Sequence, residues 1–128
     1  MTTELSDAGL EFVSDRHLAM LSTMARDGAI HQIAVGFTLH DGVVRIITSD
    51  GTQKVRNIER DGRATVGQVD GRRWISFVGN AVIERDRADI TVAENLYAAR
   101  YRQPQPNPKR VVIRIDVDRV LASVGLRA

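Results

Sequence analysis

Apolar and polar residues alternate along much of the chain, most clearly near the C-terminus. There Val111, Ile113, Ile115 and Val117 are separated by single residues, two of which are charged. A period of two is typical of a half-buried strand. Weaker versions of the pattern occur earlier, and together they predict six strands, at residues 17–26, 29–39, 43–49, 63–69, 72–85 and 111–117.

The dipeptide Asp-Gly separates several of these segments. It occurs five times, and its glycines are Gly28, Gly42, Gly51, Gly62 and Gly71. Glycine tolerates a positive φ and aspartate hydrogen-bonds to its own backbone, so the dipeptide favours tight turns. Its regular spacing predicts an antiparallel meander.

Three short helices are predicted between the strands. Ser6 is a suitable N-cap for the first helix, and Thr52 for a second helix that runs through Arg60. The third spans residues 87–100 and has apolar residues on one face. All three prolines lie within residues 103–108, which predicts an extended linker into the last strand.

The composition indicates a single globular domain over residues 1–128, with 43% hydrophobic and 27% charged residues. The chain has no cysteine, so disulfides, thiolate metal sites and a cysteine nucleophile are excluded. No apolar run approaches the ~20 residues of a membrane span, and the N-terminus has no secretion signal, so we expect a cytoplasmic protein without membrane contact.

The charge pattern argues against a nucleic-acid partner. Net charge is only +2, and the 18 basic residues, all arginine except Lys54 and Lys109, are spread along the whole chain. A nucleic-acid-binding protein usually concentrates them on one face. A small anionic ligand needs only two or three well-placed cations and agrees better with this pattern.

Several chemistries lack their motifs. The chain contains neither of the glycine-rich nucleotide-binding motifs nor a Gly-x-Ser-x-Gly elbow. His17, His31 and His40 are not at metal-binding spacing with carboxylates, so no metal is expected. No residue has the features of an indispensable nucleophile or base, and we predict no catalytic residue.

The strongest candidate site lies where the third predicted strand gives way to a helix. Thr48 and Ser49 end the strand, a glycine turn follows, and Lys54 lies in the first helical turn. A helix start offers free N–H groups and a partial positive charge to an anion. Asn57 and Arg60 follow Lys54 at steps of three, on the same face. The segment predicts a phosphate site, and the alternative is an amphipathic surface helix with solvated charges.

A second candidate is the centre of the second predicted strand, where the side chains are small. Ala34 and Gly36 occupy alternate positions of the run Gln32, Ile33, Ala34, Val35 and Gly36. Glycine weakens a strand unless another group approaches its backbone closely. Two interpretations agree equally well with this pattern: a flat ring stacks on the strand, or the strand bends or bulges at Gly36.

A third segment surrounds the turn at residues 70–71. Gln68 is a polar residue inside an apolar strand and needs a hydrogen-bonding partner. Arg73 is placed to meet either an acidic ligand or solvent. Trp74 is the only tryptophan, and core packing is the commonest role of that residue.

These segments, in this order, resemble the split β-barrel flavin and deazaflavin oxidoreductases, the superfamily of pyridoxamine 5′-phosphate oxidase. The resemblance covers nearly the whole chain and is carried by residues 18–23, 27–37, 48–49 and 53–58. Within the superfamily the chain is most similar to the branch that uses coenzyme F420, through residues 16–21, 34–38, 68–71 and 101–113.

The resemblance implies a mainly β fold, a six-stranded split β-barrel of the FMN-binding Greek-key type with three short helices. It also implies a homodimer with cofactor sites at the interface. The cofactor phosphate would then lie against Lys54 and Asn57, with Thr48 and Ser49 nearby, and the ring would lie along the strand from Gln32 to Gly36.

The same resemblance brings Gln68 and Arg73 to the border of that cleft. It implies hydride transfer from reduced F420 to a conjugated acceptor, with biliverdin reduced to bilirubin as the leading reaction and arginines pairing with the acceptor's propionates. One alternative is an FMN-binding oxidoreductase of the same fold, because both cofactors carry a ribityl phosphate. Another is a module that binds a cofactor or tetrapyrrole without turnover.

Overall fold

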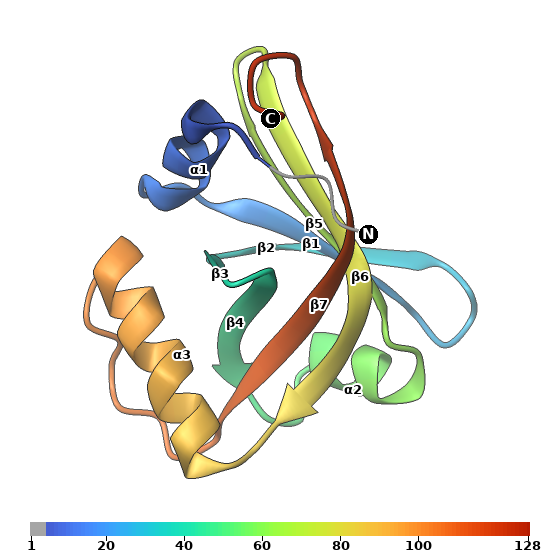
Figure 1. Cartoon of the computed structure of the whole chain (residues 1–128). Coiled ribbons are helices and arrows are strands. Elements are labelled where there is room, and N and C mark those ends of the chain that lie inside the picture. Colours follow the sequence, from blue (N-terminus) through green and yellow to red (C-terminus); the bar gives the residue numbers. More distant parts are fainter. Residues whose placement is uncertain (1–4) are drawn as a thin grey trace.

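The structure, a computed structural model, describes residues 5–128 and is built around one strongly curved sheet (Figure 1). None of the helices in this part of the chain is long and apolar enough to cross a membrane. The elements are, in chain order, α1 (Asp7–Ser14), β1 (Ala19–Met24), β2 (Ile30–Val35), β3 (Thr38–His40), β4 (Val43–Ser49), α2 (Gln53–Arg60), β5 (Arg63–Asp70), β6 (Arg73–Glu84), α3 (Arg87–Arg100) and β7 (Arg110–Ala122).

The strands form one antiparallel sheet in the order β2-β1-β5-β6-β7-β4-β3. The two edge strands, β2 and β3, are neighbours in the chain and are separated only by Gly36 and Phe37. The chain itself therefore joins the two edges of the curved sheet, as expected for a split barrel. The prediction of one strand over residues 29–39 is wrong. This segment is broken at Gly36 and Phe37 into β2 and β3, so the sheet has seven strands instead of six.

Side chains at the C-terminal end of α3 and directly after it replace strand pairing at this break. The Phe37 N–H donates a hydrogen bond to Tyr101 Oη at 3.1 Å, and the Phe37 carbonyl accepts one from Arg100 Nη1 at 2.6 Å. The backbone of Phe37 thus forms hydrogen bonds with the side chains of Tyr101 and Arg100 instead of with a strand. A Cβ on Gly36 would lie 3.2 Å from the rings of both Tyr97 and Tyr101. Of the two interpretations of Gly36, the structure therefore supports a break with close aromatic packing; whether a flat ligand also stacks there stays a prediction.

Four of the five Asp-Gly dipeptides have their glycine at positive φ, as a tight turn requires. Gly62 is the exception. It lies between α2 and β5, where its carbonyl accepts a hydrogen bond from Ala81 N–H at 2.6 Å and where a Cβ would lie 2.8 Å from the Ala81 carbonyl. Its small size serves close packing and not turn geometry.

Alternate residues of the central strands fill the barrel. Trp74 does not join them: it faces outward and is 42% exposed, so the expectation of core packing is wrong for this residue. The reason is the register of β6, in which the neighbouring Ile75 takes the inward position. Side chains at most 1% exposed include Leu21, Val66, Ile75, Phe77, Ile113 and Ile115.

All three predicted helices are confirmed. Ser6 caps α1, because its Oγ accepts a hydrogen bond from Gly9 N–H at 3.1 Å. α3 packs on the outside of the sheet through Ile90 and Ala93, which contact Val112. After α3 the chain turns back as an irregular segment, residues 101–109, before β7 begins. This segment brings its side chains next to β4 and α2, where the candidate site lies.

Candidate functional site

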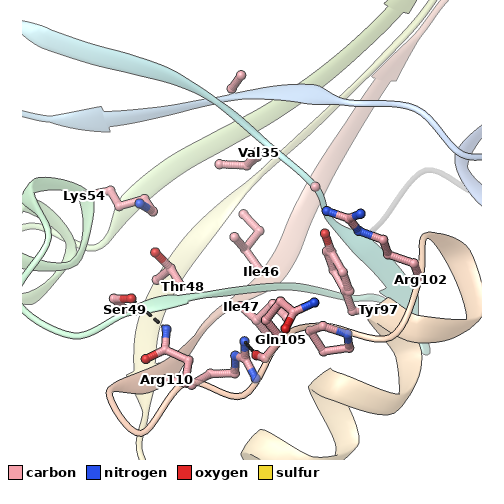
Figure 2. A pocket seen from close by; sticks show the side chains of 14 residues that line it. Val35, Ile46, Ile47, Thr48, Ser49, Lys54, Tyr97, Arg102, Gln105 and Arg110 are labelled. Atoms are coloured by element: carbon pink, nitrogen blue, oxygen red, sulfur yellow. Dashed lines mark hydrogen bonds between the residues drawn. The ribbon is translucent and has the colours of Figure 1, made fainter.

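A cavity of about 350 Å³ lies beside the break in the barrel (Figure 2). Its walls come from the end of β2, from β4, from the first turn of α2, from α3 and from the segment that follows α3. Half of the twelve residues predicted to bind the cofactor line it, namely Ala34, Val35, Gly36, Thr48, Ser49 and Lys54. The other lining residues are Ile46, Ile47, Tyr97, Arg102, Pro104, Gln105, Asn107 and Arg110.

Lys54 places an unpaired positive charge at one end of the cavity. Within residues 5–128 its ammonium forms no ion pair and no hydrogen bond, and burial lowers its pKa below the ordinary value of 10.5. Thr48 and Ser49 lie on the adjoining wall (Figure 2). A half-buried cation that lacks a protein partner is costly unless an anion completes its surroundings.

The start of α2 adds further donors at this end. Thr52 occupies the N-cap position, but its hydroxyl donates to the Ser49 carbonyl at 3.0 Å and does not cap the helix. The N-cap side chain therefore accepts no hydrogen bond from the N–H groups of the first turn of α2. These groups and the helix dipole favour negative charge at the point where Lys54 stands.

The segment after α3 is held firmly against β4. Asn107 Nδ2 donates to Ser49 Oγ at 2.8 Å, as drawn in Figure 2. Arg110, whose side chain is only 9% exposed, donates to Glu94 at 2.7 Å and to the Gln105 carbonyl at 2.6 Å. Hydrogen bonding from Arg110 is the main cause of a lowered pKa at Glu94. These contacts give the cavity a preformed wall, and they neutralise Arg110 but not Lys54.

Apolar side chains line the middle of the cavity. Figure 2 shows Val35 on one side and Ile46 and Ile47 on the other, with Lys54 and Arg102 at opposite ends. The β2 wall exposes little side-chain bulk because it consists of Ala34, Val35 and Gly36. The space is suited to a flat group with an anionic substituent at the Lys54 end.

The remaining predicted residues of β2 do not line the cavity. Gln32 faces the outer side of the sheet, where its Nε2 donates to Ser22 Oγ at 3.1 Å. Ile33 is partly buried and packs against the main core. These two side chains point to opposite faces of β2, and both lie before the part of the strand that lines the cavity, which begins at Ala34.

Asn57 and Arg60 lie on α2 but also outside the cavity lining. The Asn57 side chain is fully buried, where its Nδ2 donates to Thr23 Oγ1 at 3.1 Å and its Oδ1 accepts from Gln53 Nε2 at 2.7 Å. Arg60 donates to the carbonyl of Met24. Both residues fasten α2 to β1, and this attachment holds Lys54 in place.

Gln68 and Arg73 lie near α1. Gln68 has the partners that its burial requires: its Nε2 donates to the Phe12 carbonyl at 2.8 Å, and its Oε1 accepts from Arg100 Nη2 at 2.6 Å. The Arg73 guanidinium lies 4.8 Å from the centre of the Phe12 ring. The single chain does not bring these two residues to the cavity.

Sequence reasoning missed the wall contributed by Tyr97, Arg102, Gln105, Asn107 and Arg110. The clustering of all prolines in this region was the available signal, because proline restricts an extended segment that then presents its polar neighbours in fixed positions. Local sequence does not reveal that the segment returns to β4. No group of three or more potential metal ligands occurs within residues 5–128.

Fold and cavity together define a split β-barrel with a cavity beside the break in its sheet, lined by Lys54 at one end and by Arg102 at the other. The chain belongs to the pyridoxamine 5′-phosphate oxidase family, whose model matches residues 5–123. A relative from Mycobacterium tuberculosis (strain CDC 1551 / Oshkosh), described as F420H(2)-dependent biliverdin reductase, is 49% identical over 127 residues, which are 98% of this chain and 93% of that protein.

Two solved structures illustrate how widely the fold is shared. The conserved hypothetical protein Rv2991 from Mycobacterium tuberculosis has a TM-score of 0.81 at 26% identity, over 94% of this chain and 85% of that one. A structure described as F420 Reductase has a TM-score of 0.70 at 20% identity, over 87% of this chain and 94% of that one. At 20% identity the likeness concerns the fold alone.

Proposed function

We propose that this protein is an oxidoreductase that uses reduced coenzyme F420 to reduce biliverdin to bilirubin. The main support from comparison is the relative with that described activity, which is 49% identical over nearly the full length of both chains. Identity at this level, over 98% of this chain and 93% of that protein, supports the same cofactor and the same acceptor.

The cavity supports the proposal through its fit to the cofactor. The single observation that carries it is Lys54, a half-buried ammonium with no partner in residues 5–128, beside the hydroxyls of Thr48 and Ser49. These three groups and the start of α2 would hold the phosphate. The wall from Ala34 to Gly36 would hold the ring, because it has no bulky side chains.

When bound, reduced F420 supplies a hydride from its deazaflavin ring. The chain's own residues bind and orient the reactants and shield the cavity from water. Ile46 and Ile47 form an apolar floor, and Asn107 and Arg110 fix the segment that covers it. The acceptor gains a hydride and a proton, and we propose solvent as the source of that proton.

We also propose that the protein acts as a homodimer. The outer face of the sheet carries apolar side chains, and Met20 of β1 and Leu121 of β7 lie in one register row across it through Gly67 and Ser76. An apolar face of this kind favours a second copy, whose identical face meets it about a two-fold axis. Large apolar side chains exposed on this face are Met20, Val69, Trp74 and Leu121.

Titration of the protein with F420, followed by cofactor fluorescence, tests the proposal, with FMN titrated in parallel. We expect saturable binding of F420 and oxidation of reduced F420 only after biliverdin is added. Preferential binding of FMN, or binding of F420 without biliverdin-dependent oxidation, would contradict the proposed reaction.

A further inference from the structure

A second cavity, of about 500 Å³, adjoins the first at the end opposite Lys54. It is lined by Arg16, His17, Leu18, Tyr97, Tyr101 and Arg102. Tyr97 and Arg102 also line the first cavity, so the two spaces share a wall. We infer that this second cavity binds the propionate carboxylates of the acceptor, through Arg16 and Arg102. The inference rests on the proposed function.

The charges of this cavity are not neutralised by the protein. Within residues 5–128, neither Arg16 nor Arg102 has a hydrogen bond or ion pair. Arg100 and Arg110, close to them in the fold, are engaged: Arg100 donates to the Asp15 and Phe37 carbonyls, and Arg110 pairs with a glutamate. The two unpartnered guanidinium groups offer planar, bidentate sites that match carboxylates.

The wall between these cations is aromatic and rigid. The rings of Tyr97 and Tyr101 stack with their centres 4.8 Å apart and an angle of 28° between their planes. Tyr101 Oη donates to the His17 carbonyl at 2.7 Å and accepts from Phe37 N–H, so its ring is held in position. A fixed aromatic surface flanked by guanidinium groups suits a conjugated ring system with carboxylate side arms.

The glutamate tail of F420 also carries carboxylates, so the tail and the acceptor are two candidate sources of the carboxylates in the second cavity. The orientation of F420 along the first cavity distinguishes between them. In that cofactor the phosphate lies between the ring and the tail. With the phosphate at Lys54 and the ring along the β2 wall, the tail leaves at the Lys54 end. Figure 2 shows Arg102 at the opposite end. The carboxylates at Arg16 and Arg102 therefore belong to the acceptor.

The test measures binding and does not depend on turnover. Arg16→Gln, Arg102→Gln and the double variant are titrated with biliverdin and with its dimethyl ester, which lacks the carboxylates, by visible absorbance. Arg26→Gln, at an exposed arginine of the β1–β2 turn, is the matched control. We expect each single cavity variant to weaken biliverdin binding about 10-fold. The ester should bind wild type weakly and should be insensitive to the substitutions.

Titration with F420 carrying its tail and with a tail-less form identifies the source of the carboxylates. Unchanged affinity of Arg16→Gln for both forms supports the inference, because Arg16 lines the second cavity and not the first. A loss of affinity for the tailed form alone assigns the second cavity to the tail and overturns the inference. Wild-type affinity of the cavity variants for biliverdin also overturns the inference, as does an equal loss of biliverdin affinity in Arg26→Gln. If wild type binds no F420, the proposed function itself fails. If wild type binds F420 but the cavity variants keep wild-type affinity for biliverdin, only this inference fails.

Discussion

Lys54→Met tests the anion site directly, because it removes the ammonium and keeps most of the side-chain stem. In the free protein the ammonium is half-buried and has no partner in residues 5–128, and burial lowers its pKa. Its removal should therefore leave the melting temperature unchanged or slightly higher. A structural lysine would behave in the opposite way, since loss of its contacts would destabilise the fold.

The expected loss of cofactor affinity follows from the contact that disappears. A hydrogen bond to a charged group contributes about 1.5–3 kcal/mol. Because Lys54 is only partly buried and its charge is partly screened, we take about 2 kcal/mol, which corresponds to about a 30-fold rise in Kd. Thr48, Ser49 and the α2 amides still face the phosphate, so binding should be weakened and not abolished.

Fluorescence titration with F420 is the assay, and Lys109→Met is the matched control. Lys109 is the only other lysine in the chain, and it is exposed outside the lining of the first cavity. It should bind F420 as wild type does. An unchanged Kd in Lys54→Met, or an equal loss in both variants, refutes the assignment of Lys54 to the phosphate.

The pH dependence of the same site has a definite sign. Since burial lowers the pKa of Lys54, the charged form is disfavoured in the free folded protein. This penalty is present below the lowered pKa and disappears as the pH rises from that value towards 10.5. Cofactor affinity should decline over the same range as the ammonium deprotonates, and Lys54→Met should lack that decline.

Three further predictions concern the fold and the assembly. Tyr101→Phe leaves the buried N–H of Phe37 without its side-chain acceptor and should lower the free energy of unfolding by about 1–3 kcal/mol in urea melts; an unaltered midpoint would contradict the role of Tyr101 at the break. Leu121→Glu places a charge on the apolar outer face and should shift sedimentation from dimer to monomer, whereas a monomeric wild type would refute the dimer. Arg63→Met removes the side-chain hydrogen bonds that hold the pKa of Asp61 at about 2, so this pKa should rise towards 3.8 in an NMR titration. A lowered carboxyl pKa stabilises the fold above pH 3.8, and this contribution is lost as the pH falls through about 2. The melting temperatures of wild type and variant should therefore converge on acidification. A difference in melting temperature that stays constant with pH would contradict the coupling.

The sequence by itself determined those features that depend on neighbouring residues. Alternation over residues 111–117 marks β7, because a strand with one face in the core needs inward and outward side chains in turn. The start of α2 after Thr52 and the end of α3 before the prolines were also predicted from nearby residues, although the Thr52 hydroxyl does not cap α2. The position of Lys54 at a helix start is also a local property, and six of the twelve residues predicted to bind the cofactor line one cavity.

Only the tertiary structure decided the rest, because it depends on contacts between residues far apart in the chain. The second strand breaks at Gly36 and Phe37 because Tyr101, 64 residues beyond Phe37, supplies the hydrogen bond that a strand partner would otherwise provide. Gln68 accepts a hydrogen bond from Arg100, and Asn107 donates one to Ser49 in the wall of the cavity. Hydrophobic periodicity records which side of an element is buried. It does not indicate which side chains from distant parts of the chain contact that element, and those contacts determine which residues line the cavity.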